Sequence, residues 1–148
     1  MPRLKLDLPN SVIFTTEIEV RVTDLNYGNH LANDALQGLL HEARLRWLRQ
    51  HGFSNEQDLG GAGLIQADAA IVYRNQAFLG DLLRIEIMAG QASRHGMDLF
   101  YRIEKKHDRM VIAEAKTHLV FFDYPARRLV AMPATFKACL EKHRETTS

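Results

Sequence analysis

The chain has 148 residues, of which 46% are hydrophobic and 25% are charged, and its formal net charge is +1 at pH 7. These values are typical of one globular domain with a sizeable core, so we expect residues 1–148 to form a single domain. The near-zero net charge gives no electrostatic reason to expect nucleic acid or an anionic membrane as a partner. The single cysteine, Cys139, excludes an intramolecular disulfide and a multi-cysteine zinc site.

The N-terminal segment MPRLKLDLPN lacks the apolar core of a signal peptide. No apolar run in the chain approaches the length that a membrane span requires. We therefore expect a cytoplasmic protein that has no membrane segment.

Two segments of different periodicity come first in the chain. Residues 12–24, VIFTTEIEVRVTD, are rich in β-branched residues and alternate apolar with charged side chains, which predicts a half-buried strand. Residues 34–53, DALQGLLHEARLRWLRQHGF, repeat apolar residues at helical spacing, which predicts one amphipathic helix of about 17 residues. We expect Asn33 or Asp34 to cap the start of this helix and Gly52 to end it.

Four more strands are predicted after the glycine-rich stretch GGAG, at residues 64–75, 81–93, 96–107 and 109–123. The connections between them are short and polar or contain glycine, so we expect each strand to pair antiparallel with the next. Residues 132–143 predict a short terminal helix. The fold class is therefore α+β, with an antiparallel sheet of about five strands and one long helix. Because one helix cannot cover both faces of such a sheet, we expect a homodimer.

The segment DLNYGNHLAND, residues 24–34, places several amides and an imidazole between the first strand and the long helix. The first backbone amides of a helix have no intrahelical acceptor and lie at the positive end of the helix dipole. Such amides can stabilise an oxyanion that develops during acyl transfer. The segment therefore indicates a functional site at the start of the helix.

The order of three motifs resembles that of the hotdog-fold acyl-CoA thioesterases, and most nearly their 4-hydroxybenzoyl-CoA thioesterase-like branch. Members of that branch carry a turn of the form D-x-D-x-x-G-H-x-N-N, a helix with E-E-A-R and a later Y-x-R-P-A-x-x-G-D element. The corresponding segments here are DLNYGNHLAN, HEAR and YRNQAFLGD. The resemblance implies a sheet wrapped around a central helix and hydrolysis of an acyl-CoA or acyl carrier thioester to free acid and thiol. It also implies a homodimer with two sites at its interface, which could pair again into a homotetramer, and no cofactor beyond the coenzyme A of the substrate.

At the position of the catalytic acid, this sequence departs from the pattern of the relatives. Many of them use the second aspartate of the turn as nucleophile or general base, and Asn26 stands there in this sequence. A second hotdog branch places its acid in the helix, nine residues after a residue at the helix start, and counting from Asn33 gives Glu42. We therefore predict Asn26, His30 and Glu42 as catalytic residues, with Asn26 positioning water or the carbonyl, His30 contacting the carbonyl or orienting the base, and Glu42 as the base.

Other interpretations of these carboxylates remain open. Glu42 could instead form a solvated ion pair with Arg46, four residues further along the helix. Asp68 could supply the acid from across a dimer, and Asp24 is interpreted as a structural residue of the turn.

Three residues of the turn are predicted to bind substrate: Tyr27, Gly28 and Asn33. Gly28 is expected to adopt a backbone conformation denied to other residues, and Tyr27 could equally pack at the dimer contact. For Asn26 an Asx-turn is the structural alternative to a catalytic role.

No metal-ligand spacing, nucleophile elbow, P-loop or dinucleotide fingerprint occurs, so no metal ion is expected. Two other functions remain open at this point. A hotdog dehydratase or hydratase could use His30 and Glu42 on a β-hydroxyacyl chain. A non-catalytic acyl-CoA-binding module would explain Asn26 as the loss of the base.

Overall fold

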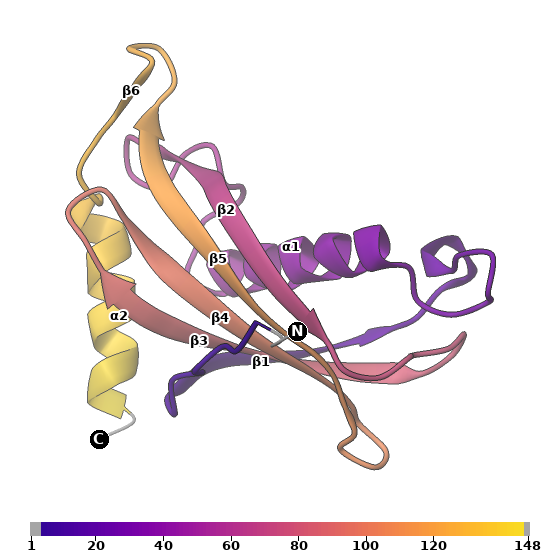
Figure 1. The fold of residues 1–148 in the computed structure, drawn as a ribbon. Coiled ribbons are helices and arrows are strands. Elements are labelled where there is room, and N and C mark those ends of the chain that lie inside the picture. The colour runs from indigo at the N-terminus through magenta and orange to yellow at the C-terminus, as the bar shows by residue number, and fades with distance from the viewer. Residues whose placement is uncertain (1–3, 147–148) are drawn as a thin grey trace.

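The computed structural model describes the backbone of residues 4–146 and the side chains of residues 4–140. Figure 1 shows one long helix lying against a curved sheet, with a second helix at the end of the chain. The elements are β1 (Val12–Glu19), the 3-10 helix η1 (Val22–Asp24), α1 (Asn33–Gln50), β2 (Gly63–Tyr73), β3 (Leu82–Ala92), β4 (Gly96–Lys105), β5 (Val111–Asp123), β6 (Arg128–Leu129) and α2 (Ala134–Thr146).

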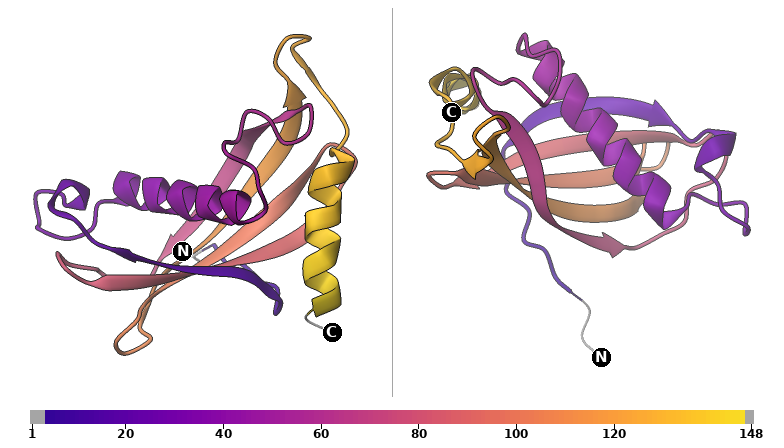
Figure 2. Two further views of the ribbon diagram at one scale, coloured as in Figure 1. Left: turned by 180° about the vertical axis from the view of Figure 1, so that it is seen from behind. Right: turned by 90° about the horizontal axis from the view of Figure 1, so that it is seen from above.

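The sheet has the strand order β1-β3-β4-β5-β2, and the two-residue β6 pairs with β5. All the pairings are antiparallel. Helix α1 crosses one face of this sheet, as both views of Figure 2 show. The predicted fold class, an antiparallel sheet around one long helix, is confirmed.

The prediction that each strand pairs with the next is wrong for β2 and β3. β2 pairs with β5 at one edge of the sheet, whereas β3 lies between β1 and β4. The connection between β2 and β3 instead packs against the entry of α1. There the amide of Leu31 donates to the carbonyl of Ala77 at 2.8 Å, and His30 forms an antiparallel bridge with Phe78. A connection that looked like a hairpin therefore builds one wall beside the start of the helix.

The apolar stripe of α1 is buried against the sheet, as its spacing predicts. Its buried apolar residues include Leu36, Leu39, Leu40, Ala43, Trp47 and Leu48. Full burial of one such side chain contributes about 1.5–3 kcal/mol, so this stripe fixes the position of α1. The indole of Trp47 meets the ring of Phe136 in α2 edge to face, with centroids 5.7 Å apart. Gly52, at φ +89°, follows the last turn of α1, as predicted.

A buried arginine links α1 to the sheet. Arg44 is 4% exposed, and its Nε donates to Oε1 of Glu56 at 2.8 Å while its Nη1 donates to the hydroxyl of Tyr101 at 3.2 Å. Burial alone would lower the pKa of Arg44, but Tyr101 and Glu56 outweigh it and raise the pKa. The arginine of the HEAR motif is therefore a structural anchor.

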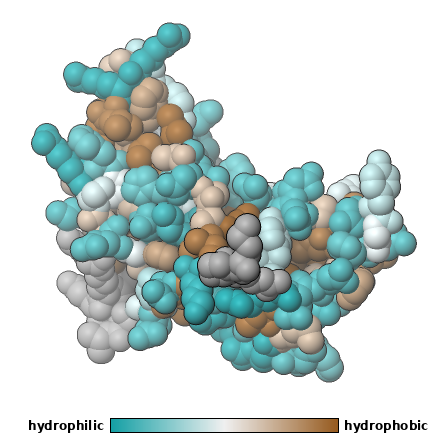
Figure 3. Space-filling view, in the orientation of Figure 1, coloured by the Kyte–Doolittle hydropathy of each residue, from teal (hydrophilic) through white to brown (hydrophobic). Residues whose placement is uncertain are grey.

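The face of the sheet turned away from α1 carries ion pairs. Arg84 contacts Glu104 at 3.1 Å, and Arg102 contacts Glu86 at 3.7 Å. Figure 3, which views the molecule from this side, shows a largely hydrophilic surface. The uncovered part of the sheet is instead β2, whose residues 66–69 are exposed at the end of the strand order. Within residues 4–146, no helix combines the length and the hydropathy that crossing a membrane requires.

Candidate active site

The turn before α1 is held by Asp24, which is 5% exposed. Its carboxylate accepts hydrogen bonds from the backbone amide of Arg21 at 2.9 Å and from the Nη2 of Arg21 at 3.1 Å. Burial opposes the charged form of Asp24, but the hydrogen bonds and charge of Arg21 outweigh it and lower the pKa of the carboxyl. The structural role predicted for Asp24 is thereby confirmed.

Asn26 folds the rest of the turn around its own side chain. Its Oδ1 accepts from the amide of Gly28 at 2.9 Å and faces the amide of His30 at 3.5 Å. This is the Asx-turn that the sequence left open for Asn26. The left-handed backbone, with φ +62°, falls on Asn29, so the prediction for Gly28 is wrong. Asn29 occupies the position of the glycine in the family's turn pattern, and asparagine tolerates this conformation.

Gly28 is needed for a different reason. A Cβ at this position would lie 3.0 Å from both Cδ2 and Nε2 of His30. The absence of a side chain therefore lets the imidazole of His30 lie directly over the turn.

Helix α1 begins without a side-chain cap. Its N-cap is Ala32, which carries no capping group, and the amide of Leu36 donates to the carbonyl of Ala32 at 3.0 Å. The prediction that Asn33 or Asp34 caps the helix is wrong, because both lie inside its first turn. The amide of Ala32 donates to the carbonyl of Asp24 at 2.9 Å, which fixes Ala32 at the helix start. The helix therefore begins one or two residues before the position predicted from the polar side chains. The first helical amides consequently have no intrahelical acceptor and no side-chain cap.

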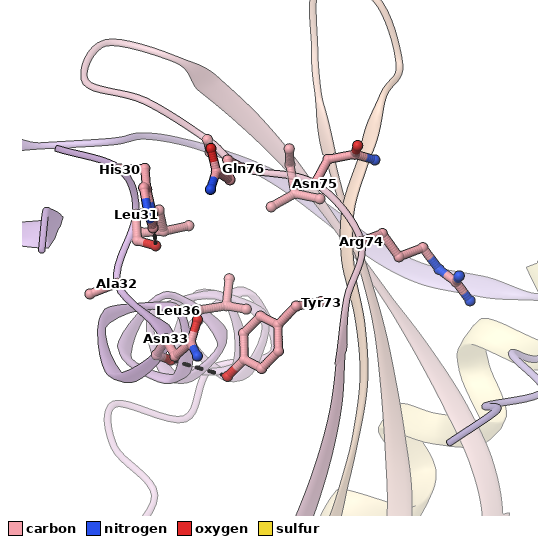
Figure 4. Close-up of a pocket in the computed structure, with 11 residues that line it drawn as sticks. His30, Leu31, Ala32, Asn33, Leu36, Tyr73, Arg74, Asn75 and Gln76 are labelled. Atoms are coloured by element: carbon pink, nitrogen blue, oxygen red, sulfur yellow. Dashed lines mark hydrogen bonds between the residues drawn. The ribbon is translucent and has the colours of Figure 1, made fainter. Parts of the chain in front are cut away.

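A cavity of about 250 Å³ opens at this end of α1 (Figure 4). It is lined by His30, Leu31, Ala32, Asn33, Leu36, Tyr73, Arg74, Asn75, Gln76, Ala77 and Ile112. His30 and Gln76 lie near each other at one end of the cavity, with Leu36 and Tyr73 at the other, whereas Arg74 and Asn75 point away. The hydroxyl of Tyr73 faces the carbonyl of Asn33 at 3.5 Å. Apolar walls and a few polar groups thus meet at a helix N-terminus, as in many ligand sites.

Of the predicted site residues, His30 and Asn33 line this cavity. Asn26 and Gly28 do not line the cavity, but both contact His30 from the turn. Tyr27 is fully exposed at the tip of the turn.

The cavity contains no carboxylate among its lining residues in the described part of the chain. One carboxylate nevertheless acts on it from the first turn of α1. Burial raises the pKa of Tyr73, and the negative charge of Asp34 raises it further. Asp34 is exposed, and no described side chain forms an ion pair or hydrogen bond with it.

Glu42 lies elsewhere, in a groove of about 630 Å³ on the other flank of α1. Its carboxylate accepts from Nε of Arg46 at 2.7 Å, and Arg46 also donates to Thr16 of β1. The ion-pair alternative is therefore confirmed. Within one chain, the structure does not bring Glu42 together with His30, so its catalytic role stays a prediction without geometric support.

Asp68 also lies away from the cavity. It pairs in register with His118 and approaches Lys116 at 3.5 Å, on the sheet face opposite α1. Within one chain it therefore does not reach the end of the helix, and its role from across a dimer stays a prediction.

Sequence reasoning missed Tyr73, Gln76 and Asp34. A signal for Gln76 was present, because it replaces the proline of the family's Y-x-R-P-A pattern with an amide. Asp34 was missed because the sequence analysis assigned it a structural role as a helix cap and considered no catalytic role for it.

A long helix on an antiparallel sheet, whose uncapped N-terminus opens on a partly apolar cavity, is the arrangement expected of a hotdog-fold protein that binds an acyl thioester. The chain belongs to the thioesterase-like superfamily, whose sequence model matches residues 20–140. The expected family and the expected class of activity, acyl-CoA thioester hydrolysis, are confirmed.

Several proteins are similar to this chain. The 1,4-dihydroxy-2-naphthoyl-CoA hydrolase of Synechocystis is 26% identical over 129 residues, which cover 86% of this chain and 94% of that protein. The crystal structure of a 1,4-dihydroxy-2-naphthoyl-CoA thioesterase from Synechocystis matches with a TM-score of 0.79 at 26% identity, over 86% of this chain and 94% of that one. A Staphylococcus aureus protein solved in complex with CoA has a TM-score of 0.81 at 17% identity, over 89% of this chain and 84% of that one, which shows a shared fold.

Proposed function

We propose that this chain hydrolyses its acyl-CoA substrate in the cavity at the N-terminus of α1, as a cytoplasmic, single-domain homodimer. The observation that carries this proposal is the uncapped start of α1 at a cavity lined by His30 and Asn33. An uncapped helix N-terminus favours a group with negative charge, such as a polarised carbonyl oxygen. The cavity gives such a group access to the start of α1.

The thioester carbonyl is held by two kinds of donor. The free amides of the first turn of α1 point out of the helix, and the imidazole of His30 lies beside them. Both strengthen their hydrogen bonds as the carbonyl oxygen becomes negative in the tetrahedral intermediate. Removal of one such donor typically lowers the rate by about 10²–10³-fold.

Asp34 acts as the general base that activates water. Its negative charge raises the pKa of Tyr73, which lines the cavity, whereas Glu114, the carboxylate beside the lining residue Arg74, is paired with that arginine. It follows Asn33 directly in the first turn of α1, and it is not neutralised by a described ion pair. A carboxylate in the first turn of a helix interacts favourably with the helix dipole. Glu42, by contrast, is held by Arg46.

The substrate is a small, hydroxylated acyl group, for which an aromatic acid is the first choice. The relative from Synechocystis is a hydrolase of 1,4-dihydroxy-2-naphthoyl-CoA by name. In this chain, Leu36 and Ile112 supply apolar walls, while Tyr73 and Gln76 offer hydrogen bonds to a ring hydroxyl.

The homodimer forms through the exposed edge of β2, and two such dimers could pair into a tetramer. Residues 66–69 of this strand are exposed, and Tyr73 at its end lines the cavity. Pairing with a second copy would cover unpaired backbone groups and bring the partner to the cavity.

Thiol release from a panel of acyl-CoAs tests the proposal, with 1,4-dihydroxy-2-naphthoyl-CoA, benzoyl-CoA and a long saturated acyl-CoA as substrates. We expect the hydroxyaryl substrate to give the highest kcat/KM, and His30→Gln to lower kcat by about 10²-fold. If folded protein binds coenzyme A but releases no thiol from any substrate, the chain is a binding module and the proposal fails.

A further inference from the structure

We propose that Asn26 holds the imidazole of His30 in the tautomer with its proton on Nε2, so that His30 acts as a hydrogen-bond donor to the thioester oxygen and not as a base. The inference rests on the proposed function, since it assigns the role of His30 within that site. Asn26 is then a positioning residue. The inference also explains why an asparagine stands where many relatives have an aspartate.

The first step is the orientation of the Asn26 amide. Its Oδ1 accepts from the backbone amide of Gly28 at 2.9 Å and faces that of His30 at 3.5 Å. Because backbone N–H groups can only donate, the oxygen must face them, which settles the assignment that is ordinarily ambiguous for an amide. The other end of the amide, Nδ2, then lies 3.4 Å from Nδ1 of His30.

The second step is the proton of the imidazole. An amide nitrogen is a donor only, so the Nδ1 that it contacts must be the unprotonated, accepting nitrogen. In the neutral ring the proton then resides on Nε2. The carbonyl of Leu31, at 3.5 Å from Nδ1, would accept from the opposite tautomer or from the doubly protonated ring. Asn26 at 3.4 Å and Leu31 at 3.5 Å thus compete for Nδ1, and our proposal assigns Nδ1 to Asn26.

The third step is the availability of Nε2. No described residue forms a hydrogen bond with this nitrogen, and His30 lines the cavity. A Cβ on Gly28 would lie 3.0 Å from Nε2, so the bare glycine is what allows the ring to lie here. An N–H on Nε2 would therefore have no described acceptor in the protein and could donate to a substrate.

The charged groups around the ring do not oppose this arrangement. Among the described lining residues, Tyr73 and Arg74 are the other titratable groups. Arg74 points away from the cavity and pairs with Glu114. In the turn itself, the carboxylate of Asp24 is held by Arg21. An aspartate in place of Asn26 would instead accept a hydrogen bond from a protonated Nδ1. Its negative charge would also favour the doubly protonated ring.

NMR of protein with ¹⁵N-labelled histidine tests the inference, because a protonated and a bare ring nitrogen differ widely in chemical shift. The His30 signals are those lost in His30→Gln. We expect wild-type protein, at a pH where an ordinary imidazole is neutral, to show a protonated Nε2 and a bare Nδ1. A protonated Nδ1, or an even mixture of tautomers, would overturn the proposal.

Asn26→Asp is the decisive variant and Asn29→Asp its matched control, since both add one carboxylate to the same exposed turn. We expect Asn26→Asp to move the proton to Nδ1 and to keep the ring doubly protonated to higher pH. Asn29→Asp should leave the tautomer and kcat unchanged, because Asn29 has no described contact with the ring. If Asn26→Asp leaves the His30 spectrum unchanged, the inference is wrong.

The tautomer and the activity are read separately, so the two proposals can fail independently. A protonated Nε2 in a protein that releases no thiol would retain the inference and reject the proposed function. A protonated Nδ1 in a protein whose activity collapses in His30→Gln would retain the proposed function and reject the inference.

Discussion

The two hollows on either side of the first turns of α1 differ in chemistry. The cavity of about 250 Å³ has no carboxylate among its described lining residues, whereas the groove of about 630 Å³ is lined by Glu17, Glu19, Asp24, Asp34 and Glu42. Most of the charge in the groove is neutralised locally, because Asp24 pairs with Arg21, Glu42 with Arg46 and Glu17 with Lys106.

The cavity is poorer in charge but richer in unsatisfied groups. The first amides of α1 have no side-chain cap, and Nε2 of His30 has no described partner. A ligand gains more from donors that have no protein partner than from carboxylates that are already paired. We therefore propose the smaller hollow as the place where the thioester carbonyl binds, with Asp34 of the groove acting from its border.

The largest expected effect concerns Asp34, which lines the groove but acts on the cavity through Tyr73. We predict that Asp34→Asn lowers kcat by about 10²–10⁴-fold, the usual range for loss of a general base. Its side chain is exposed and has no described partner, so the variant should fold normally, which circular dichroism and Tm would verify. Equal activity of Asp34→Asn and wild type would remove Asp34 from the mechanism.

A smaller effect is expected for Asp24, whose role is structural. Asp24→Asn should lower the free energy of unfolding at neutral pH by about 1.5 kcal/mol, because it removes charged hydrogen bonds from Arg21. Since the pKa of Asp24 is lowered in the folded state, its stabilisation is present above the ordinary pKa of about 3.9 and is lost as the pH falls through the folded-state value. Urea unfolding at several pH values measures this.

The difference between Asp24→Asn and wild type should accordingly narrow in acid. A difference that stays constant down to the lowest pH at which the protein folds would contradict the ion-pair account of this turn.

Gln76 tests the cavity wall that the connection between β2 and β3 forms. We predict that Gln76→Leu lowers kcat/KM for a hydroxylated aryl-CoA by about 2–10-fold, the worth of one neutral hydrogen bond of about 0.5–1.5 kcal/mol. The unsubstituted benzoyl-CoA has no ring hydroxyl and should be affected less. An equal loss for both substrates would mean that Gln76 shapes the cavity without recognising a hydroxyl.

The smallest effect is expected in the groove. Glu42→Gln breaks a half-exposed pair with Arg46, so it should change the free energy of unfolding by about 0.5 kcal/mol or less and leave kcat within about twofold. It is also the matched control for Asp34→Asn, since both remove one carboxylate from α1. Loss of thiol release in Glu42→Gln would restore the catalytic role predicted from the helix spacing.

Most of the fold could be predicted because its signals are local. The stripe from Leu36 to Trp47 carries the helical period, and the alternation in β3, β4 and β5 carries the strand period. The partner of β2 could not be predicted in this way. A short connection favours a hairpin, but the contact of Ala77 with Leu31 is between residues far apart in sequence, and it directs the chain to the helix entry instead.

The sequence predicted the position that we propose for the site, but not the acid that we propose for it. The turn from Asp24 to Asn33 indicated the helix N-terminus, where the cavity lies. The spacing that pointed to Glu42 could not say which flank of α1 this residue occupies, because that depends on how the helix is rotated on the sheet. The role of Asp34 depends on its proximity to Tyr73, on a strand distant in sequence.

The central claim is that the thioester carbonyl binds at the start of α1. A crystal structure with a non-hydrolysable acyl-CoA analogue, in which the thioester sulfur is replaced by a methylene group, tests this most directly. We predict its carbonyl oxygen within hydrogen-bond distance of Nε2 of His30 and of the first amides of α1. A carbonyl bound in the groove beside Glu42, with the cavity empty, would contradict the account.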